Sequence, residues 1–251
     1  MPVVRETDPR PPALEVAVAH ALVEAANLKG SDPFRLVRLY RPAPTVAFGR
    51  LDALRPGFAA AAAAARAHGF EPVLRAPGGH AVAYHEGCLG VDEVVAAADP
   101  IAGMQERFAA SGERLAGALA TLGVDARVGR VPREFCPGDF TVNARGRVKL
   151  VGTAQRVVRH ASLLAASVAV TGVDALRAVL EDVYAALELD WDPGTMGGVA
   201  DEVPGTTVDA VEAAVLAAYG GEETALDPAV LEAAEVLRPR HEVVAGRTSA
   251  G

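Results

Sequence analysis

Apolar positions along the chain alternate between helical and strand spacing. Apolar side chains recur at helical spacing over residues 12–28, and Gly30 follows as a stop signal. An alanine-rich segment, 56–68, begins with a proline and ends before Gly69, which predicts a second helix. The same spacing predicts further helices over residues 104–122, 173–187, 207–219 and 228–237.

Short apolar runs bounded by turn residues predict strands between these helices. Residues 34–40 and 45–49, joined by Pro42 and Pro44, are expected to form a hairpin or adjacent strands. The other expected strands are 71–74, 81–84, 88–95, 127–131, 140–143, 148–153, 155–158 and 163–170, with a turn at 145–146. Runs of strands with helices between and after them predict an α+β domain with a largely antiparallel sheet.

The stretch 191–205 is rich in Gly, Asp and Pro, which indicates a flexible loop or a boundary. We therefore expect a catalytic domain over residues 1–190. A C-terminal helical extension, 191–251, is expected to pack on the same domain.

Composition excludes several classes of protein. A net charge of -8 and a pI near 5.3 argue against a general nucleic-acid binder or a binder of anionic membranes. No apolar run reaches membrane-spanning length, and the first twelve residues are charged and proline-bearing, unlike a signal peptide. We expect a cytoplasmic protein whose two cysteines, Cys88 and Cys136, stay reduced.

Lysine is scarce in this chain. Of 24 Lys and Arg residues only Lys29 and Lys149 are lysines, a bias typical of a GC-rich bacterial genome. Arginine serves wherever a generic positive charge is sufficient, so Lys149 is expected to be needed as an amine.

The segment from Arg75 to His85 is the first candidate for chemistry. The glycine pair Gly78 and Gly79 follows a strand and lets backbone amides approach a ligand, and Arg75 can meet a phosphate or a carboxylate. The alternative is a plain β-turn. His80 and His85 lack a third ligand nearby, so we expect no metal site.

Cys136 lies directly before a turn, where an exposed thiol can react. The alternative is that Cys136 serves only as a small, buried hydrophobic side chain. If residues 140–143 and 148–153 pair as neighbouring strands, Lys149 would lie close to Cys136. Gly152, on the lysine's own strand, is typical of a close approach by a ligand, although an exposed strand lysine would look the same. Cys88 is expected to be a buried structural cysteine.

The order of these motifs resembles the lipoate-protein ligase and octanoyltransferase family, which is related to biotin-protein ligases. The resemblance covers residues 36–170. It implies the fold of biotin-protein ligase and class II aminoacyl-tRNA synthetase catalytic domains. It also implies that an acyl chain lies in a tunnel beside the glycine loop and that Lys149 holds the acyl carbonyl or the mixed anhydride. It implies these binding residues: Arg75, Gly78, Gly79, His80, Ala81, Asp139, Gly152, Thr153, Ala154 and Gln155.

The Cys-Pro-Gly-Asp segment is most similar to the cysteine-dependent octanoyltransferases. That resemblance implies that Cys136 takes an octanoyl group from acyl carrier protein or another octanoylated carrier and passes it to a lysine of a lipoyl-domain protein. Lys149 would polarise the carbonyl or stabilise the thiolate. This route requires no cofactor, and its substrates are octanoyl or lipoyl groups.

Two alternatives stay open. An ATP-dependent lipoate ligase would use ATP and magnesium, with Arg75 and the Gly78 and Gly79 amides near the adenylate phosphate. The Leu51-Asp52 pair, where many ligases have asparagine, and the short C-terminal region favour transfer. A relative that binds lipoate or an acyl carrier without catalysis is the other alternative, supported by His80 at an unusual position.

Overall fold

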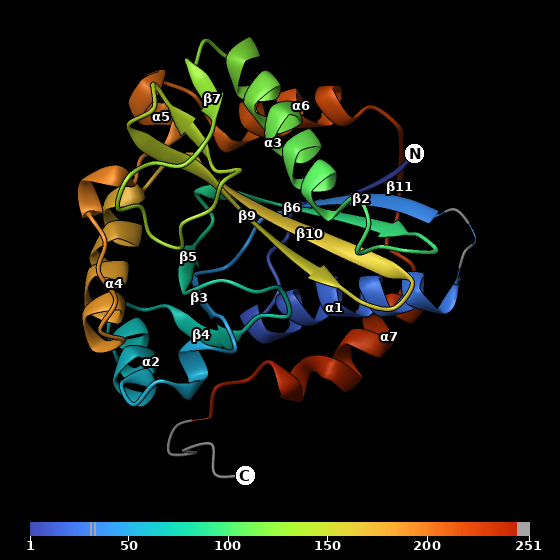
Figure 1. The fold of residues 1–251 in the computed structure, drawn as a ribbon, viewed down its shortest axis with the longest axis horizontal. Coiled ribbons are helices and arrows are strands. Elements are labelled where there is room, and N and C mark those ends of the chain that lie inside the picture. The colour runs from blue at the N-terminus through green and yellow to red at the C-terminus, as the bar shows by residue number, and fades with distance from the viewer. Residues whose placement is uncertain (31, 33, 245–251) are drawn as a thin grey trace.

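A mixed eight-stranded sheet crosses the centre of the molecule (Figure 1). The structure is a computed structural model and describes residues 1–30, 32 and 34–244. The strands, in spatial order, are β11 (Glu222–Thr224), β1 (Pro2–Glu6), β2 (Phe34–Tyr40), β6 (Cys88–Ala96), β10 (Ala161–Ala169), β9 (Val148–Val157), β8 (Val142–Ala144) and β7 (Ala126–Val128). Only the pairs of β1 with β2 and β11 are parallel, which confirms the α+β class with a largely antiparallel sheet.

A second, three-stranded sheet carries the loops of the site. Its centre is β3 (Thr45–Phe48), parallel to β4 (Glu71–Leu74) and antiparallel to β5 (Val82–Tyr84). The expected hairpin of 34–40 with 45–49 is therefore wrong, because β2 and β3 belong to different sheets. Pro42 and Pro44 lie in the connection, where fixed φ angles and missing N–H groups favour an extended crossing over a hydrogen-bonded turn.

Helices cover both faces of the large sheet. On one face lie α1 (Pro12–Leu28) and α7 (Pro228–Leu237), and on the other lie α3 (Met104–Thr121) and α6 (Val208–Tyr219) (Figure 1). Strand alternation supplies both interfaces: on β2, for example, Val37 and Leu39 pack towards α3 and α6, while Leu36 packs towards α1. Beside the small sheet, α2 (Phe58–Ala67) packs on α4 (Val173–Ala186).

Most predicted elements are confirmed with small shifts in their ends. The helix over 12–28 has the expected bounds, and the two runs 148–153 and 155–158 are one continuous strand, β9. The short strands β1 and β11 were not predicted. The stretch 191–205 contains α5 (Val199–Glu202) and buries Trp191, Met196 and Val199, so it packs against the core where a flexible loop or a boundary was expected.

Residues after 190 make extensive contacts with the earlier part of the chain. Helix α6 packs on α3, α7 packs on α1, and β11 pairs with β1. The division at residue 190 stays a prediction. Among the described residues, no helix is both long enough and apolar enough to cross a membrane.

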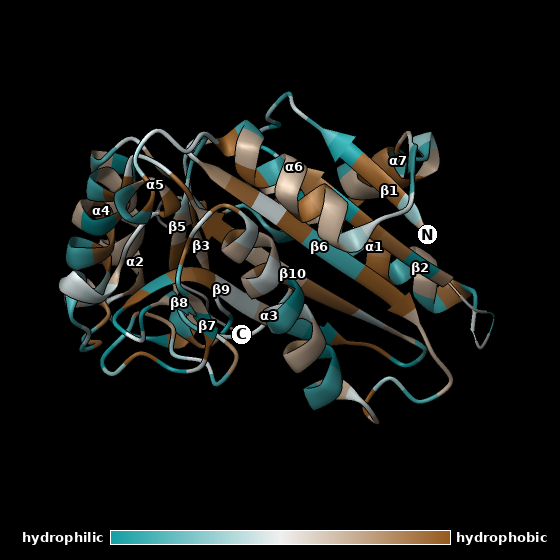
Figure 2. Ribbon diagram, turned by 90° about the horizontal axis from the view of Figure 1, so that it is seen from above, coloured by the Kyte–Doolittle hydropathy of each residue, from teal (hydrophilic) through white to brown (hydrophobic). Residues whose placement is uncertain are grey.

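A buried ionic cluster joins β1, α1, β2 and β6. The Arg38 side chain has no exposed area and binds Glu6 at 2.6 Å, Asp92 at 3.1 Å and also Glu15. Asp92 belongs to a short hydrophilic stretch that interrupts the otherwise apolar β6 and is visible in teal in Figure 2. A guanidinium is suited to this position because it can serve several carboxylates at once.

Replacing Arg38 by methionine should lower the free energy of unfolding by about 3 to 5 kcal/mol, because buried carboxylates would lose their shared cation. The matched control is Arg35→Met on the same strand, where the side chain is 46% exposed and a loss of at most about 1 kcal/mol is expected. Chemical denaturation of both variants measures the difference. Equal losses would contradict a special role for the Arg38 cluster.

Candidate active site

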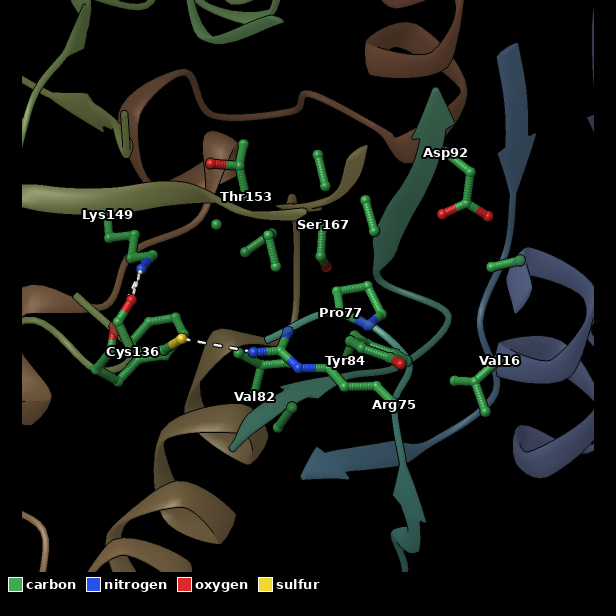
Figure 3. Close-up of a pocket in the computed structure, with 18 of the residues that line it drawn as sticks. Val16, Arg75, Pro77, Val82, Tyr84, Asp92, Cys136, Lys149, Thr153 and Ser167 are labelled. Carbon is green, nitrogen blue, oxygen red and sulfur yellow. Dashed lines mark hydrogen bonds between the residues drawn. The ribbon is translucent and has the colours of Figure 1, made fainter. Parts of the chain in front are cut away.

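An elongated pocket lies between the α1 face of the large sheet and the small sheet (Figure 3). Its free space, the open mouth included, is about 880 Å³. Small side chains make much of the wall, among them Ala19, Ala76, Ala83, Ala154, Ala165 and Ala169. A wall of this kind suits an aliphatic chain, because it offers apolar contact without filling the space.

Cys136 lies at one end of this pocket in a strained backbone conformation. Its φ angle is 41°, in the left-handed region that non-glycine residues rarely adopt. The amide N–H of Cys136 donates to the hydroxyl of Tyr184 at 2.9 Å, and that hydroxyl donates to the carbonyl of Ala81, also at 2.9 Å. Tyr184, from α4, therefore connects the cysteine loop to the start of β5. Strain of this kind at a reactive position is typical of a functional site.

The ammonium group of Lys149 holds the same loop from the other side. It donates to the carbonyls of Phe135 at 3.0 Å and Cys136 at 2.8 Å, and lies 3.2 Å from the carboxylate of Glu134. The three N–H groups of the ammonium thus have three acceptors in the protein. Burial lowers the pKa of Lys149, while the neighbouring Glu134 carboxylate opposes that shift.

The pairing on which the return of Lys149 to the cysteine loop depends is present. Strands β8 and β9 are antiparallel, with Asn143 opposite Lys149. The expected role of Lys149 on an acyl carbonyl stays a prediction. In this conformation, its contacts position the backbone of Cys136.

Arg75 is the cation beside the thiol. Its Nη2 atom lies 3.6 Å from Sγ of Cys136 (Figure 3). The same atom donates to the carbonyl of His80 at 2.9 Å. The guanidinium can donate a hydrogen bond to the sulfur, which is the atom that would act as nucleophile. The sequence suggested that Arg75 binds a phosphate or a carboxylate. In the structure, its guanidinium contacts the sulfur of Cys136.

Gly79 permits this contact. A Cβ atom at Gly79 would lie 2.7 Å from Nη2 of Arg75 and 2.8 Å from Sγ of Cys136, and φ is +92°. Gly78, the other glycine of the pair, has open space around it. Of the two glycines, Gly79 therefore makes the expected close backbone approach, and the group that it approaches is the thiol of Cys136.

A second, more open pocket adjoins the first, with a free space of about 720 Å³ that includes open solvent. Cys136, Thr153 and Ala154 line both. The cysteine therefore lies where a largely apolar pocket meets a more open one. A chain bound in the first pocket would present its end to a partner entering through the second.

The structure brings most of the predicted site residues together. The first pocket is lined by Arg75, Cys136, Lys149, Gly152, Thr153 and Ala154, and the second adds Gly78, Gly79, Asp139 and Gln155. His80 and Ala81 take part differently: the His80 ring binds Asp52 at 2.8 Å, and Ala81 supplies a carbonyl to Tyr184. Cys88 is 1% exposed, and burial raises its pKa to about 12, as expected of a structural cysteine.

Sequence reasoning missed Tyr184, Glu134 and Asp92. Tyr184 lies far along the chain from Cys136, and no local pattern joins them. Glu134, two positions before Cys136, was detectable as an acid beside the proposed nucleophile. In the described part of the chain, no cluster of three His, Cys, Asp or Glu side chains is arranged to hold a metal ion.

Comparison with solved structures defines the class of fold. A candidate lipoate protein ligase from T. acidophilum with bound lipoic acid superposes with a TM-score of 0.76 at 20% identity, over 95% of this chain and 94% of that one. A lipoate-protein ligase A bound with ATP gives 0.73 at 21% identity, over 99% of this chain and 96% of that one. The chain has the lipoate-protein ligase fold.

The family follows from the sequence match. Residues 11–219 match the lipoyl protein ligase A/B catalytic domain, and the chain belongs to this family. A curated relative, octanoyl-[GcvH]:protein N-octanoyltransferase of Geobacillus kaustophilus, is 28% identical over 164 residues, 65% of this chain. The aligned segment spans 57% of that relative's length.

Gly79→Ala should slow alkylation of Cys136 by N-ethylmaleimide severalfold at neutral pH, because the new Cβ would displace Arg75 from the thiol. Strain at positive φ should also lower the free energy of unfolding by about 1 to 3 kcal/mol. Gly78→Ala is the matched control and should change neither. Site-resolved mass spectrometry separates Cys136 from the buried Cys88, and equal alkylation of both variants would contradict the contact.

Lys149→Met should lower the free energy of unfolding by about 3 to 5 kcal/mol, because Glu134 would be left as an unpaired buried charge. Adding Glu134→Gln should recover part of this loss. The exposed Lys29 provides the control: Lys29→Met should change stability by less than about 1 kcal/mol. A second substitution that recovers nothing would argue against the Lys149 and Glu134 pair.

Proposed function

We propose that this protein transfers an octanoyl or lipoyl group to a lysine of a lipoyl-domain protein through a thioester on Cys136. One observation carries the proposal: the Cys136 thiol lies beside Arg75, at the junction of an apolar pocket and an open one. This arrangement offers an activated nucleophile, a binding site for the chain and a path for the acceptor.

In the first step, the Cys136 thiolate attacks the acyl carbonyl of an octanoylated carrier. A new carbon–sulfur bond forms, and the bond from the carbonyl to the carrier's sulfur or lysine nitrogen breaks. The leaving group takes up one proton. Arg75 contacts the attacking sulfur, and a covalent intermediate divides the transfer into two easier reactions.

In the second step, the neutral amine of a lipoyl-domain lysine attacks the thioester from the open pocket. A carbon–nitrogen amide bond forms, the carbon–sulfur bond breaks, the amine nitrogen loses one proton, and Cys136 returns to its free form. Neither step consumes ATP, because the reaction exchanges one acyl bond for another: it is downhill overall from a thioester carrier and close to balanced from an amide-linked carrier. We propose no cofactor for this route.

The apolar pocket would hold the acyl chain during both steps. Burial of each methylene group contributes about 0.8 kcal/mol, so the seven carbons beyond an octanoyl carbonyl would contribute roughly 6 kcal/mol. That is enough to retain the chain while the carrier is exchanged. The strained loop at Cys136 keeps the reacting atoms at one end of the pocket.

We propose a protein of the GcvH type as donor, in line with the curated relative, and a lipoyl-domain protein as acceptor. A carrier lysine or thiol that presents the acyl group on a flexible arm would enter through the open pocket. We place the reaction in the cytoplasm, where both free cysteines would remain reduced.

The ATP-dependent route is less well supported by the site. It would require Lys149 to bind the acyl-phosphate oxygen, yet the Lys149 ammonium is saturated by Glu134 and two carbonyls. It would also require Arg75 to bind phosphate, whereas its guanidinium contacts the thiol and the carbonyl of His80.

Incubation with octanoylated GcvH or octanoyl-carrier protein should add one octanoyl group to Cys136, detected by mass spectrometry. Cys136→Ala should abolish both the adduct and transfer to an apo lipoyl domain, while Cys88→Ala should retain both. ATP and magnesium should have no effect. An active Cys136→Ala variant would exclude the thioester, and transfer from free lipoate only with ATP would establish the ligase instead.

A further inference from the structure

Strand β9 has one edge that is unpaired over its second half. The strand runs from Val148 to Val157, and β8 pairs with it only as far as Val151. Figure 1 shows the tip of β9 extending far from β7. Among the described residues, no strand pairs with this edge over residues 152–157, which we call the free edge. The free edge is as long as a typical strand, and an unpaired edge is a template for another chain.

The hairpin that joins β9 to β10 decides which backbone groups of the free edge point outward. The N–H of Val158 donates to the carbonyl of Ala161 at 2.9 Å, so the backbone groups of Val158 point to β10. Backbone groups alternate in direction along an antiparallel strand, and the register with β10 is unbroken. The N–H and C=O groups of Thr153, Gln155 and Val157 therefore point away from β10. They form no hydrogen bond with any residue that the structure describes.

The free edge leads into the open pocket beside Cys136. Thr153, Ala154 and Gln155 line that pocket together with the cysteine. A polypeptide segment that paired with the free edge would therefore lie beside the pocket, and a lysine of that segment could enter it. The second step of the proposed function needs an acceptor lysine at this place.

Two half-buried arginines flank the free edge, one on each face of β9. Arg107, from α3, donates to the side chain of Gln155 at 3.1 Å. Arg156 is the next residue of β9, so its side chain points to the opposite face, where Nη1 lies 3.5 Å from the carbonyl of Ala76. In the described part of the chain, both guanidiniums contact only carbonyl and amide oxygens. Burial lowers the pKa of Arg107, and the neighbouring Glu106 opposes this shift only in part.

We propose that an extended, acidic segment of the lipoyl-domain protein, beside its acceptor lysine, pairs with the free edge of β9 as an added strand and places carboxylates on Arg107 and Arg156. Main-chain hydrogen bonds supply affinity, and the acidic side chains supply specificity. Neighbouring residues of an added strand point to opposite faces, so one acid reaches each arginine. A second copy of this chain fits less well, because it would bring the same arginines together. The proposal rests on the proposed function in taking a lipoyl-domain protein as the acceptor.

Amide hydrogen exchange, followed by NMR on the full chain, tests the pairing directly. Saturation with an apo lipoyl domain should slow exchange severalfold at the outward amides of Thr153, Gln155 and Val157. The amides of Ala154 and Arg156 point to β10 and should change little. Unchanged exchange at all three outward amides would overturn the proposal. Protection that appears without the domain and grows with protein concentration would also overturn it, in favour of a second copy.

Val157→Pro should weaken binding of the apo lipoyl domain severalfold in isothermal titration calorimetry. Proline removes an outward N–H while the hydrogen bonds to β10 stay in place. Val157→Ala is the matched control: it keeps the N–H and should bind as tightly as the wild type. Thermal unfolding confirms that both variants are folded, and equal binding by the two would overturn the added strand.

Arg107→Gln and Arg156→Gln should each weaken binding severalfold and reduce its dependence on salt, because each removes one charge that faces the acidic segment. Arg147→Gln is the matched control, since Arg147 is an exposed arginine just before the other end of β9. The control removes the same charge and should bind as the wild type does. Equal binding by all three variants would overturn the role of the two arginines.

Acylation of Cys136 by octanoyl-N-acetylcysteamine, a small thioester, separates the failure of this proposal from the failure of the proposed function. The adduct should form equally in the wild type and in every edge variant, because the small donor does not need the free edge. An adduct and transfer with unaltered binding in every variant would overturn the added strand and leave the proposed function intact. Binding that depends on the free edge, without any adduct on Cys136, would support the added strand and overturn the thioester. Failure of the apo domain to bind the wild type would overturn the added strand.

Discussion

A single buried ammonium group organises the loop on which the site depends. Lys149 binds the carbonyls of Phe135 and Cys136 and the carboxylate of Glu134, all within the segment that carries the thiol. The cost of burying its charge is offset only while these acceptors stay in place, so the ammonium and the loop stabilise each other. The left-handed conformation of Cys136 is held between this ammonium and the hydroxyl of Tyr184.

The two sheets supply different parts of the site around this loop. The large sheet supplies the long strands β9 and β10 that form one wall of the pocket, and the small sheet supplies the glycine loop and Arg75. A thiol at the meeting point of two sheets can be approached from an enclosed side and an open side. A transfer reaction needs such an arrangement, because the bound chain and the incoming amine must reach one carbonyl carbon from different directions.

The Arg38 cluster links stability to the depth of the pocket. It joins three strands of the large sheet to α1, and one of its carboxylates, Asp92, faces the pocket. The residues that stabilise the core therefore also set the charge at the end of the pocket remote from Cys136.

The sequence by itself determined the helices, most strands and the ordered motifs of the family, because these depend on local spacing. Only the tertiary structure decided that β2 and β3 enter different sheets, that Arg75 contacts sulfur, and that Tyr184 and Asp92 reach the pocket. These contacts join residues far apart in the chain. Periodicity records which face of an element is buried, but not which distant partner covers it.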